Sequence, residues 1–213
     1  MGLDRSDLQR LQSMVKHSGE LACGSHLFRV GDRFTAIYAV RSGCIKSYTL
    51  DAGGHEFVHG FHLRGELLGF DAVYPDRHCC NAVILQTCSV CVIPYRDIAR
   101  LSLDIHSMHS QLVRLMSREF SKQLTNREGA GATQRIAAFL LNIRSRLRDP
   151  ESSSEVFRLP MTREDIASYL SISAETLSRL LAKLHGMGLI DVRRRQVRLV
   201  DAARLDLIAQ GMN

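Results

Sequence analysis

The chain has 213 residues, 45% of them hydrophobic and 23% charged, which is ordinary for a globular protein long enough to bury a substantial core. Its formal net charge of +6 indicates a mild preference for polyanions. No apolar run reaches the roughly 18–20 residues of a membrane helix and no signal-peptide pattern occurs, so we expect a cytoplasmic protein without a membrane partner.

The first half of the chain alternates short β-rich runs with glycine-bearing turns, after an amphipathic helix predicted over 3–17. Short strands separated by glycine turns predict a small antiparallel barrel or sandwich. We place the strands at 34–40, 44–50, 57–63, 81–87 and 90–93, with glycine turns at Gly31, Gly43, Gly53, Gly54 and Gly65.

Six cysteines occur, all in this half. In a cytoplasmic chain they serve as thiols, metal ligands or redox groups rather than as a disulfide framework. Cys88 and Cys91 have a CxxC spacing, but residues three apart on a strand point to opposite faces, so we expect no chelation by this pair. We expect most of the six to be small buried hydrophobic residues: Cys23, Cys44, Cys79, Cys80, Cys88 and Cys91.

Residues 95–127 contain no glycine or proline and show helical periodicity, which predicts a long helix before a hinge at 128–131. Its two adjacent apolar stripes are wider than one packing partner needs, so we expect part of this face to contact a second copy of the chain in a homodimer. A helix packed wholly on its own β-barrel is the alternative. The expected interface residues are Met108, Leu112, Val113, Leu115, Met116, Phe120 and Gln123.

The last third of the chain is predicted to be mainly helical. A helix over 133–148 precedes a polar loop at 149–155. Residues 161–185 then have the pattern of two short helices joined by a tight turn, with Thr162 capping the first helix and Ser173 the second. This arrangement is typical of a helix-turn-helix, in which the start of the second helix enters the DNA major groove.

Three polar residues near the start of the second helix are the expected base-reading residues. Glu175, Ser178 and Arg179 are spaced i, i+3 and i+4, so they share one exposed face. Arginine bonds guanine O6 and N7, glutamate accepts from a cytosine amino group, and serine bonds a base or contacts a thymine methyl. The alternative is a surface helix with a Glu175–Arg179 ion pair, worth only about 0.3–0.5 kcal/mol.

A β-hairpin is predicted next, with strands at 189–192 and 197–200 after Gly186 and Gly188 end the second helix. Its tip, 193–196, carries three adjacent arginines. Such a wing beside a recognition helix suits contacts with DNA phosphates, which add affinity without sequence information. The expected backbone contacts are Thr162, Ser173, Thr176, Arg193, Arg194 and Arg195.

This order of elements resembles the Crp/Fnr family of bacterial transcription regulators over essentially the whole chain, and it is most similar to the fumarate and nitrate reduction (FNR) branch. The stretches that carry the resemblance are YAVRSGCIKSYT (38–49), GFHLRGELLGFDAV (60–73), VCVIP (90–94), MTREDIASYLSISAETLSRLL (161–181) and GLI (188–190). Two rival classes fit less well. An enzyme would need a motif such as a P-loop, GxSxG or HExxH, and a DNA-free cyclic-nucleotide-binding regulatory module would lack the helix-turn-helix.

The resemblance implies an α+β fold. An N-terminal antiparallel β-roll of the cyclic-nucleotide-binding type (1–96) would act as sensor, a long dimerisation helix and hinge (97–130) would follow, and a C-terminal winged helix-turn-helix (131–213) would bind DNA. It further implies a dimer on an inverted repeat, TTGAT–four bases–ATCAA, with RNA polymerase as partner, in oxygen- or redox-linked gene control. The two recognition helices of such a dimer would lie about 34 Å apart.

Four signals are open for the β-roll: a cyclic nucleotide, haem, direct thiol oxidation and an iron–sulfur cluster. For a cyclic nucleotide, Gly65 and Glu66 match the start of the family's phosphate-binding segment, but His78 and Cys79 stand where the resemblance requires an arginine and a serine or threonine. Arg77 is out of register, so we expect no cyclic nucleotide. Haem is a second option, with candidate ligands His55, His59, His62 and His78, and direct oxidation of Cys79, Cys80 or Cys91 is a third.

An oxygen-labile 4Fe–4S cluster is the cofactor that the FNR resemblance implies, held by three N-terminal cysteines and one in the roll. Cys91 matches the roll ligand, and Met1-Gly2-Leu3 matches the end of the cysteine-bearing segment. We therefore predict no cofactor in this chain as written and a possible cluster in a longer form. Gln123 is neutral where the resemblance places acidic character, so we expect the chain to dimerise without a cluster.

Overall fold

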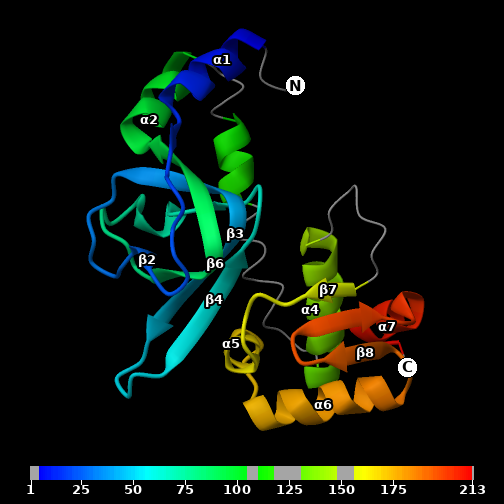
Figure 1. Ribbon diagram of the computed structural model, residues 1–213. Coiled ribbons are helices and arrows are strands. Elements are labelled where there is room, and N and C mark those ends of the chain that lie inside the picture. Colours follow the sequence, from blue (N-terminus) through cyan, green and yellow to red (C-terminus); the bar gives the residue numbers. More distant parts are fainter. Residues whose placement is uncertain (1–4, 105–109, 118–130, 148–155, 213) are drawn as a thin grey trace. The chain divides into compact units, whose positions relative to one another are not determined.

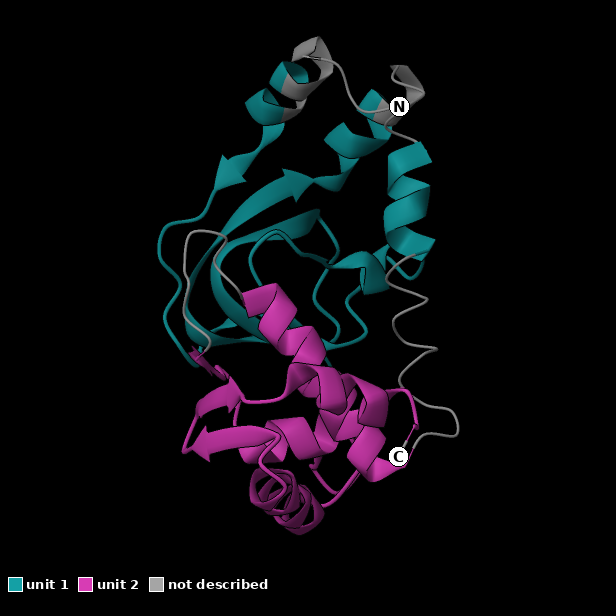
Figure 2. Cartoon of the chain, turned by 90° about the vertical axis from the view of Figure 1, so that its right-hand side faces the viewer, with its two compact units in different colours: residues 1–50, 59–125 teal, residues 51–58, 126–213 magenta. Residues whose placement is uncertain are grey.

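The computed structural model describes residues 5–104, 110–117, 131–147 and 156–212. It divides into two compact units (Figures 1 and 2). The first unit holds Met1–Leu50 and His59–Thr125, and the second holds Asp51–Val58 and Asn126–Asn213. The domain boundaries after residues 96 and 130 stay a prediction, because compactness alone does not separate the roll from the helical segment that follows it.

The first unit is built on an antiparallel sheet, as the repeated short strands indicated. The strands pair in the order β1-β6-β3-β4, with β2 also paired to β6 and β5 to β3. Their bounds are β1 Lys16–His17, β2 His26–Phe28, β3 Ala36–Leu50, β4 Glu56–His62, β5 Leu67–Leu68 and β6 Asn81–Pro94.

Two of these strands are longer than the sequence suggested. The predicted turn at Gly43 is wrong: β3 continues through it, and the register with β6 shifts between Val40 and Ile45 instead. Gly43 has a φ of +83°, and a Cβ there would lie 2.6 Å from the carbonyl oxygen of Thr87. A glycine that looks like a turn is thus a bulge inside a strand, where only the smallest residue fits against the partner.

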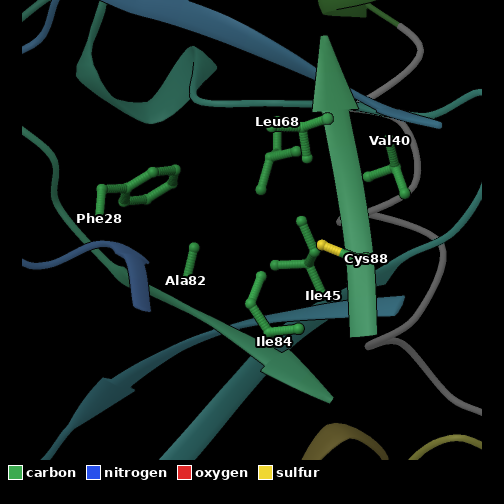
Figure 3. Close-up of a cluster of buried hydrophobic side chains, with 8 residues drawn as sticks. Phe28, Val40, Ile45, Leu68, Ala82, Ile84 and Cys88 are labelled. Atoms are coloured by element: carbon green, nitrogen blue, oxygen red, sulfur yellow. The ribbon is translucent and has the colours of Figure 1, made fainter. Parts of the chain in front are cut away.

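The core of this unit lies between the strands, where apolar side chains of β3 and β6 meet those of β2 and β5 (Figure 3). Val40, Ile45, Ile84 and Val90 are at most 2% exposed. Cys44 and Cys88 are buried as predicted, but the expectation that most cysteines are buried is wrong. Cys80 and Cys91 are only partly buried, and Cys23 and Cys79 are exposed.

Helices precede and follow the sheet strands along the chain. The helix predicted over 3–17 is wrong at its end, because α1 covers Arg5–Met14 and the following residues form β1. A single 3-10 turn, η1, covers Phe70–Ala72, and α2 covers Tyr95–Asp104. Residues 110–117 are helical too, while Met108, Phe120, Gln123 and most of the predicted hinge lie outside the described residues.

The second unit packs helices against a small sheet. Strand β9 lies between β7 and β8, and α4 packs on α7. The elements are α4 Ala132–Leu147, β7 Val156–Arg158, α5 Arg163–Tyr169, α6 Ala174–Gly186, β8 Ile190–Arg193, β9 Gln196–Leu199 and α7 Ala202–Ala209. The sequence analysis missed β7 and α7. Among the described residues, no helix is both long and apolar enough to cross a membrane.

Candidate nucleic-acid interface

The first helix of the helix-turn-helix, α5, starts at a capping box. The Thr162 hydroxyl accepts from the amide of Asp165 at 3.1 Å, and the Asp165 carboxylate accepts from the amide of Thr162 at 2.9 Å. The same hydroxyl also donates to that carboxylate, which is buried. Thr162 is therefore the predicted N-cap, but a DNA phosphate would compete for a hydroxyl that already has two partners.

Replacing Thr162 with alanine should lower the free energy of unfolding by about 0.5–2 kcal/mol, because an amide at the start of α5 loses its acceptor. Urea unfolding followed by circular dichroism measures this change. Thr162→Ser keeps the hydroxyl and should stay close to wild type. Equal stability of the alanine variant and the wild type would show that the capping box contributes nothing.

The turn between α5 and α6 is fixed by short backbone bonds and a second cap. Ser171 adopts a φ of 53°, a left-handed conformation, and its amide bonds the carbonyl of Ser168 at 3.0 Å. Ser173 caps α6: its hydroxyl accepts from the Thr176 amide at 3.1 Å and donates to the Thr176 hydroxyl at 2.9 Å. The turn thus sets the direction in which α6 leaves α5.

Helix α6 has one buried and one exposed face. Leu177, Leu181 and Leu184 are at most 6% exposed, and Leu180 is half-buried. The three expected base-reading side chains, Glu175, Ser178 and Arg179, lie together on the exposed face.

The contacts among these three side chains are weak. Arg179 Nε lies 3.8 Å from Glu175 Oε1, with the side chains 70% and 82% exposed. An exposed pair at this distance is worth about 0–1 kcal/mol, so it does not hold either side chain back from a ligand. Ser178 donates to the carbonyl of Ala174 at 2.9 Å. The Glu175–Arg179 ion pair expected for a plain surface helix is therefore present. Its contribution to stability is too small to account for this choice of residues.

The wing is a hairpin with a tighter tip than predicted. Arg193 pairs with Gln196, so the tip consists of Arg194 and Arg195 alone. Arg194 has a φ of 56°, and the Arg195 carbonyl accepts from the Leu159 amide at 2.8 Å. The three arginines are exposed, but Arg193 lies 3.6 Å from the Asp191 carboxylate, which offsets part of its charge.

One arginine at this surface was missed by the sequence analysis. Arg163 Nη2 donates to the carbonyl of Arg194 at 3.3 Å, and its pKa is lowered by burial, which the charge of Glu164 partly opposes. A groove of about 380 Å³ separates the start of α5 from the wing tip, with Arg163, Arg194 and Arg195 among its lining residues. No signal in the sequence pointed to Arg163, because its partner lies 31 residues away.

The first unit contains a cavity of about 370 Å³, and several predicted sensor residues line it. His59, His62, Cys79, Cys80 and Asp71 all contribute to its wall. His59 lies 2.9 Å from the Thr49 hydroxyl, and His62 lies 3.0 Å from that of Ser47.

The other residues singled out for sensing lie elsewhere. His55 is an exposed residue bonded to Asp51, and Arg77 donates to the carbonyl of Gly31 at 2.8 Å. Cys91 lies 3.5 Å from the Nδ1 of His17. Among the described residues, no three His, Cys, Asp or Glu side chains come together as a metal site, so they do not supply the four thiolates of a 4Fe–4S cluster.

Two known domain families match the chain. Residues 19–104 match the cyclic nucleotide-binding domain, and residues 134–208 match the Crp-like helix-turn-helix domain. The electron transport regulator A of Shewanella oneidensis is 36% identical over 97% of this chain and 84% of its own length. The fumarate and nitrate reduction regulatory protein of Vibrio cholerae is 37% identical over 95% of this chain and 82% of its own length. The chain belongs to the Crp/Fnr family of transcription regulators.

Solved structures agree with this assignment at the level of the fold. FixK2 from Bradyrhizobium japonicum superimposes with a TM-score of 0.83, over 91% of this chain and 96% of that chain, at 24% sequence identity. The resemblance and the α+β fold class predicted from the sequence are confirmed. This Crp/Fnr chain is thus a DNA-binding transcription regulator and not an enzyme.

Proposed function

We propose that the chain is an FNR-type regulator that binds a TTGAT–four bases–ATCAA inverted repeat as a homodimer. Three exposed polar side chains at the start of a capped second helix carry this proposal. Arg179 would bond the guanine of TTGAT, Glu175 would accept from a cytosine amino group on the complementary strand, and Ser178 would contact a neighbouring base. The hydroxyls of Ser173 and Thr176 at the start of α6 and the wing arginines would contact phosphates.

Fluorescence anisotropy with a labelled inverted repeat tests the proposal. Binding to the repeat should be at least a thousandfold tighter than to a duplex of scrambled sequence at the same salt concentration. A second duplex with the guanine of each half-site replaced should fall between the two. Equal affinity for the repeat and the scrambled duplex would refute the proposed box.

The wing should contribute to affinity without contributing to specificity. Arg194→Gln should weaken binding to every duplex and flatten the dependence of log K on log salt by about 0.9, because one phosphate contact is lost. Titrations at several salt concentrations measure this slope. Arg198→Gln removes the same charge from an exposed position on β9 and should leave the slope closer to that of wild type. Identical slopes for both variants would mean that only net charge matters.

The homodimer is proposed from the exposed apolar residues of the helical segment 110–117. Val113 and Met116 are 53% and 43% exposed, while Leu112 packs on the core of the first unit. A second copy of the chain would cover the exposed pair, and Met108, Leu115, Phe120 and Gln123 would extend the interface along the predicted helix. Dimerisation also supplies the two half-site readers that an inverted repeat requires.

We further propose that the regulator acts in the cytoplasm, with RNA polymerase as partner, in oxygen- or redox-linked gene control. The names of two relatives, electron transport regulator A and fumarate and nitrate reduction regulatory protein, support this assignment. In a longer form with an N-terminal cysteine segment, Cys91 would be one ligand of a 4Fe–4S cluster. A reporter gene behind the inverted repeat, assayed with and without oxygen, tests the link to oxygen.

A further inference from the structure

The cavity of the first unit lies in the part of the chain that matches the cyclic nucleotide-binding domain, and a carboxylate of the chain itself reaches into it. Asp71 Oδ2 accepts from the amide of Cys79 at 2.8 Å and lies 3.5 Å from the Cys80 thiol. Its other oxygen, Oδ1, lies 3.4 Å from Nδ1 of His78. His78 and Cys79 are the two residues that stand where the family resemblance requires the phosphate-binding arginine and serine or threonine.

The local structure holds Asp71 in this place. Gly69 has a φ of +103° and starts the 3-10 turn η1, which places Asp71 at the cavity wall. A Cβ on Gly69 would lie 3.3 Å from the carbonyl oxygen of Ala36, so a larger residue would crowd β3. On the other side, His78 is 3% exposed and stacks on Phe28 with ring centroids 3.6 Å apart. Both the carboxylate and its imidazole partner are therefore fixed by the fold.

The charges around the cavity favour the Asp71 carboxylate over an anion bound from solution. Burial raises the pKa of Asp71, but the bonds from His78 and from the Cys79 amide outweigh it, and the net pKa lies below the ordinary value. The side chain is thus a carboxylate at neutral pH. The described residues that line the cavity include no arginine or lysine that would attract a second anion. A cyclic phosphate would meet a like charge and an amide that already has an acceptor.

We infer that Asp71 is an internal substitute for the phosphate of a cyclic nucleotide, so that the β-roll keeps its anion site filled and takes no cyclic nucleotide. The carboxylate and the cyclic phosphate each carry one negative charge and two exposed oxygens, so one can take the bonds of the other. At the two positions that the resemblance assigns to the phosphate, the His78 imidazole and the Cys79 amide bond the Asp71 carboxylate instead. The role of Asp71 is independent of the proposed DNA box, and no DNA is needed to test it.

Calorimetric titration of the full chain with cyclic AMP and with cyclic GMP is the first arm of the test. No binding heat is expected up to millimolar nucleotide. Binding of either nucleotide at micromolar concentration would overturn the inference, because the site would then be open.

The second arm removes the Asp71 carboxylate by substitution and adds small anions that can bind in its place. Asp71→Ala should melt several degrees below wild type and should recover part of that loss in sodium formate or inorganic phosphate, but not in sodium chloride of equal ionic strength. Asp71→Asn is the matched control. The asparagine side chain fills the same space, and its carbonyl oxygen can still accept from the backbone N–H of Cys79. Wild type and Asp71→Asn should show only the smaller, general stabilisation that phosphate gives a folded protein relative to chloride.

Two results of the second arm would count against the inference. If Asp71→Ala is as stable as wild type, or is destabilised without any response to formate or phosphate, the site does not bind anions. If Asp71→Ala folds in none of these salts, Asp71 is a structural cap of the Cys79 amide and not a replacement for a ligand.

Discussion

Arg179→Ala is expected to weaken binding to the inverted repeat by about 1–3 kcal/mol, a loss of roughly 5- to 150-fold in affinity. The loss should be specific to duplexes that carry the guanine of TTGAT, because a bidentate arginine contact distinguishes that base from the others. Since the Arg179 side chain is 70% exposed and makes only long contacts with Glu175 and Thr176, the variant should fold like wild type. Anisotropy titrations on the repeat and on guanine-replaced duplexes measure both effects.

Two control variants separate base reading from charge. Arg179→Lys keeps the positive charge but loses the planar, two-donor geometry, so it should lose most of the discrimination at the guanine. Lys183→Ala removes a charge from the same face of α6 one turn after Arg179, in the last turn and beyond the N-terminal residues proposed to enter the groove, and should leave the discrimination at the guanine intact. If Arg179→Ala weakens all duplexes equally, Arg179 contacts a phosphate and the assignment is wrong.

The sequence predicted the helix-turn-helix well because its structure is set by local signals. A threonine and a serine at the two caps, acidic residues in the first turns and a leucine stripe all act within a few residues of one another. The observed caps at Thr162 and Ser173 and the end of α6 at Gly186 follow directly from those signals. The exposure of Glu175, Ser178 and Arg179 follows from the same spacing.

The elements that the sequence missed depend on partners far away in the chain. Strand β7 has only three residues, and it forms because Phe157 pairs with Val197 of β9. Gly43 was taken for a turn because the bulge it forms depends on the opposite strand, around Cys88. No local pattern reports either pairing, so both errors come from tertiary contacts overriding a local signal.

The contact between Arg163 and the wing tip and that between Asp71 and Cys79 have the same origin. Each joins a side chain to a backbone group that the fold brings near, and neither involves residue types that form a recognisable motif. Sequence reasoning did indicate that His78 and Cys79 depart from a phosphate-binding pair. It did not indicate what replaces the phosphate, because Asp71 lies in a different part of the pattern and reaches the site through η1.

Met116→Glu is expected to convert the chain from a dimer to a monomer at tens of micromolar protein, where we expect wild type to be dimeric. A dimer with two-fold symmetry buries both copies of a substituted residue, so two carboxylates would enter an apolar contact without partners. Each such uncompensated charge costs about 3–5 kcal/mol, which is more than enough to weaken dimerisation a hundredfold. Analytical ultracentrifugation measures the oligomeric state. Affinity for the inverted repeat should fall by at least tenfold, because two half-sites are then bound independently.

Arg114→Glu is the matched control for this change. On a helix with about 100° between successive residues, Arg114 lies roughly 160° around the axis from Met116. Arg114 is exposed as well, so the substitution adds a carboxylate to the same segment outside the proposed interface. It should leave the dimer intact, although its effect on DNA affinity through net charge will remain. If Met116→Glu stays dimeric while Arg114→Glu dissociates, the proposed interface lies on the wrong side of this helix.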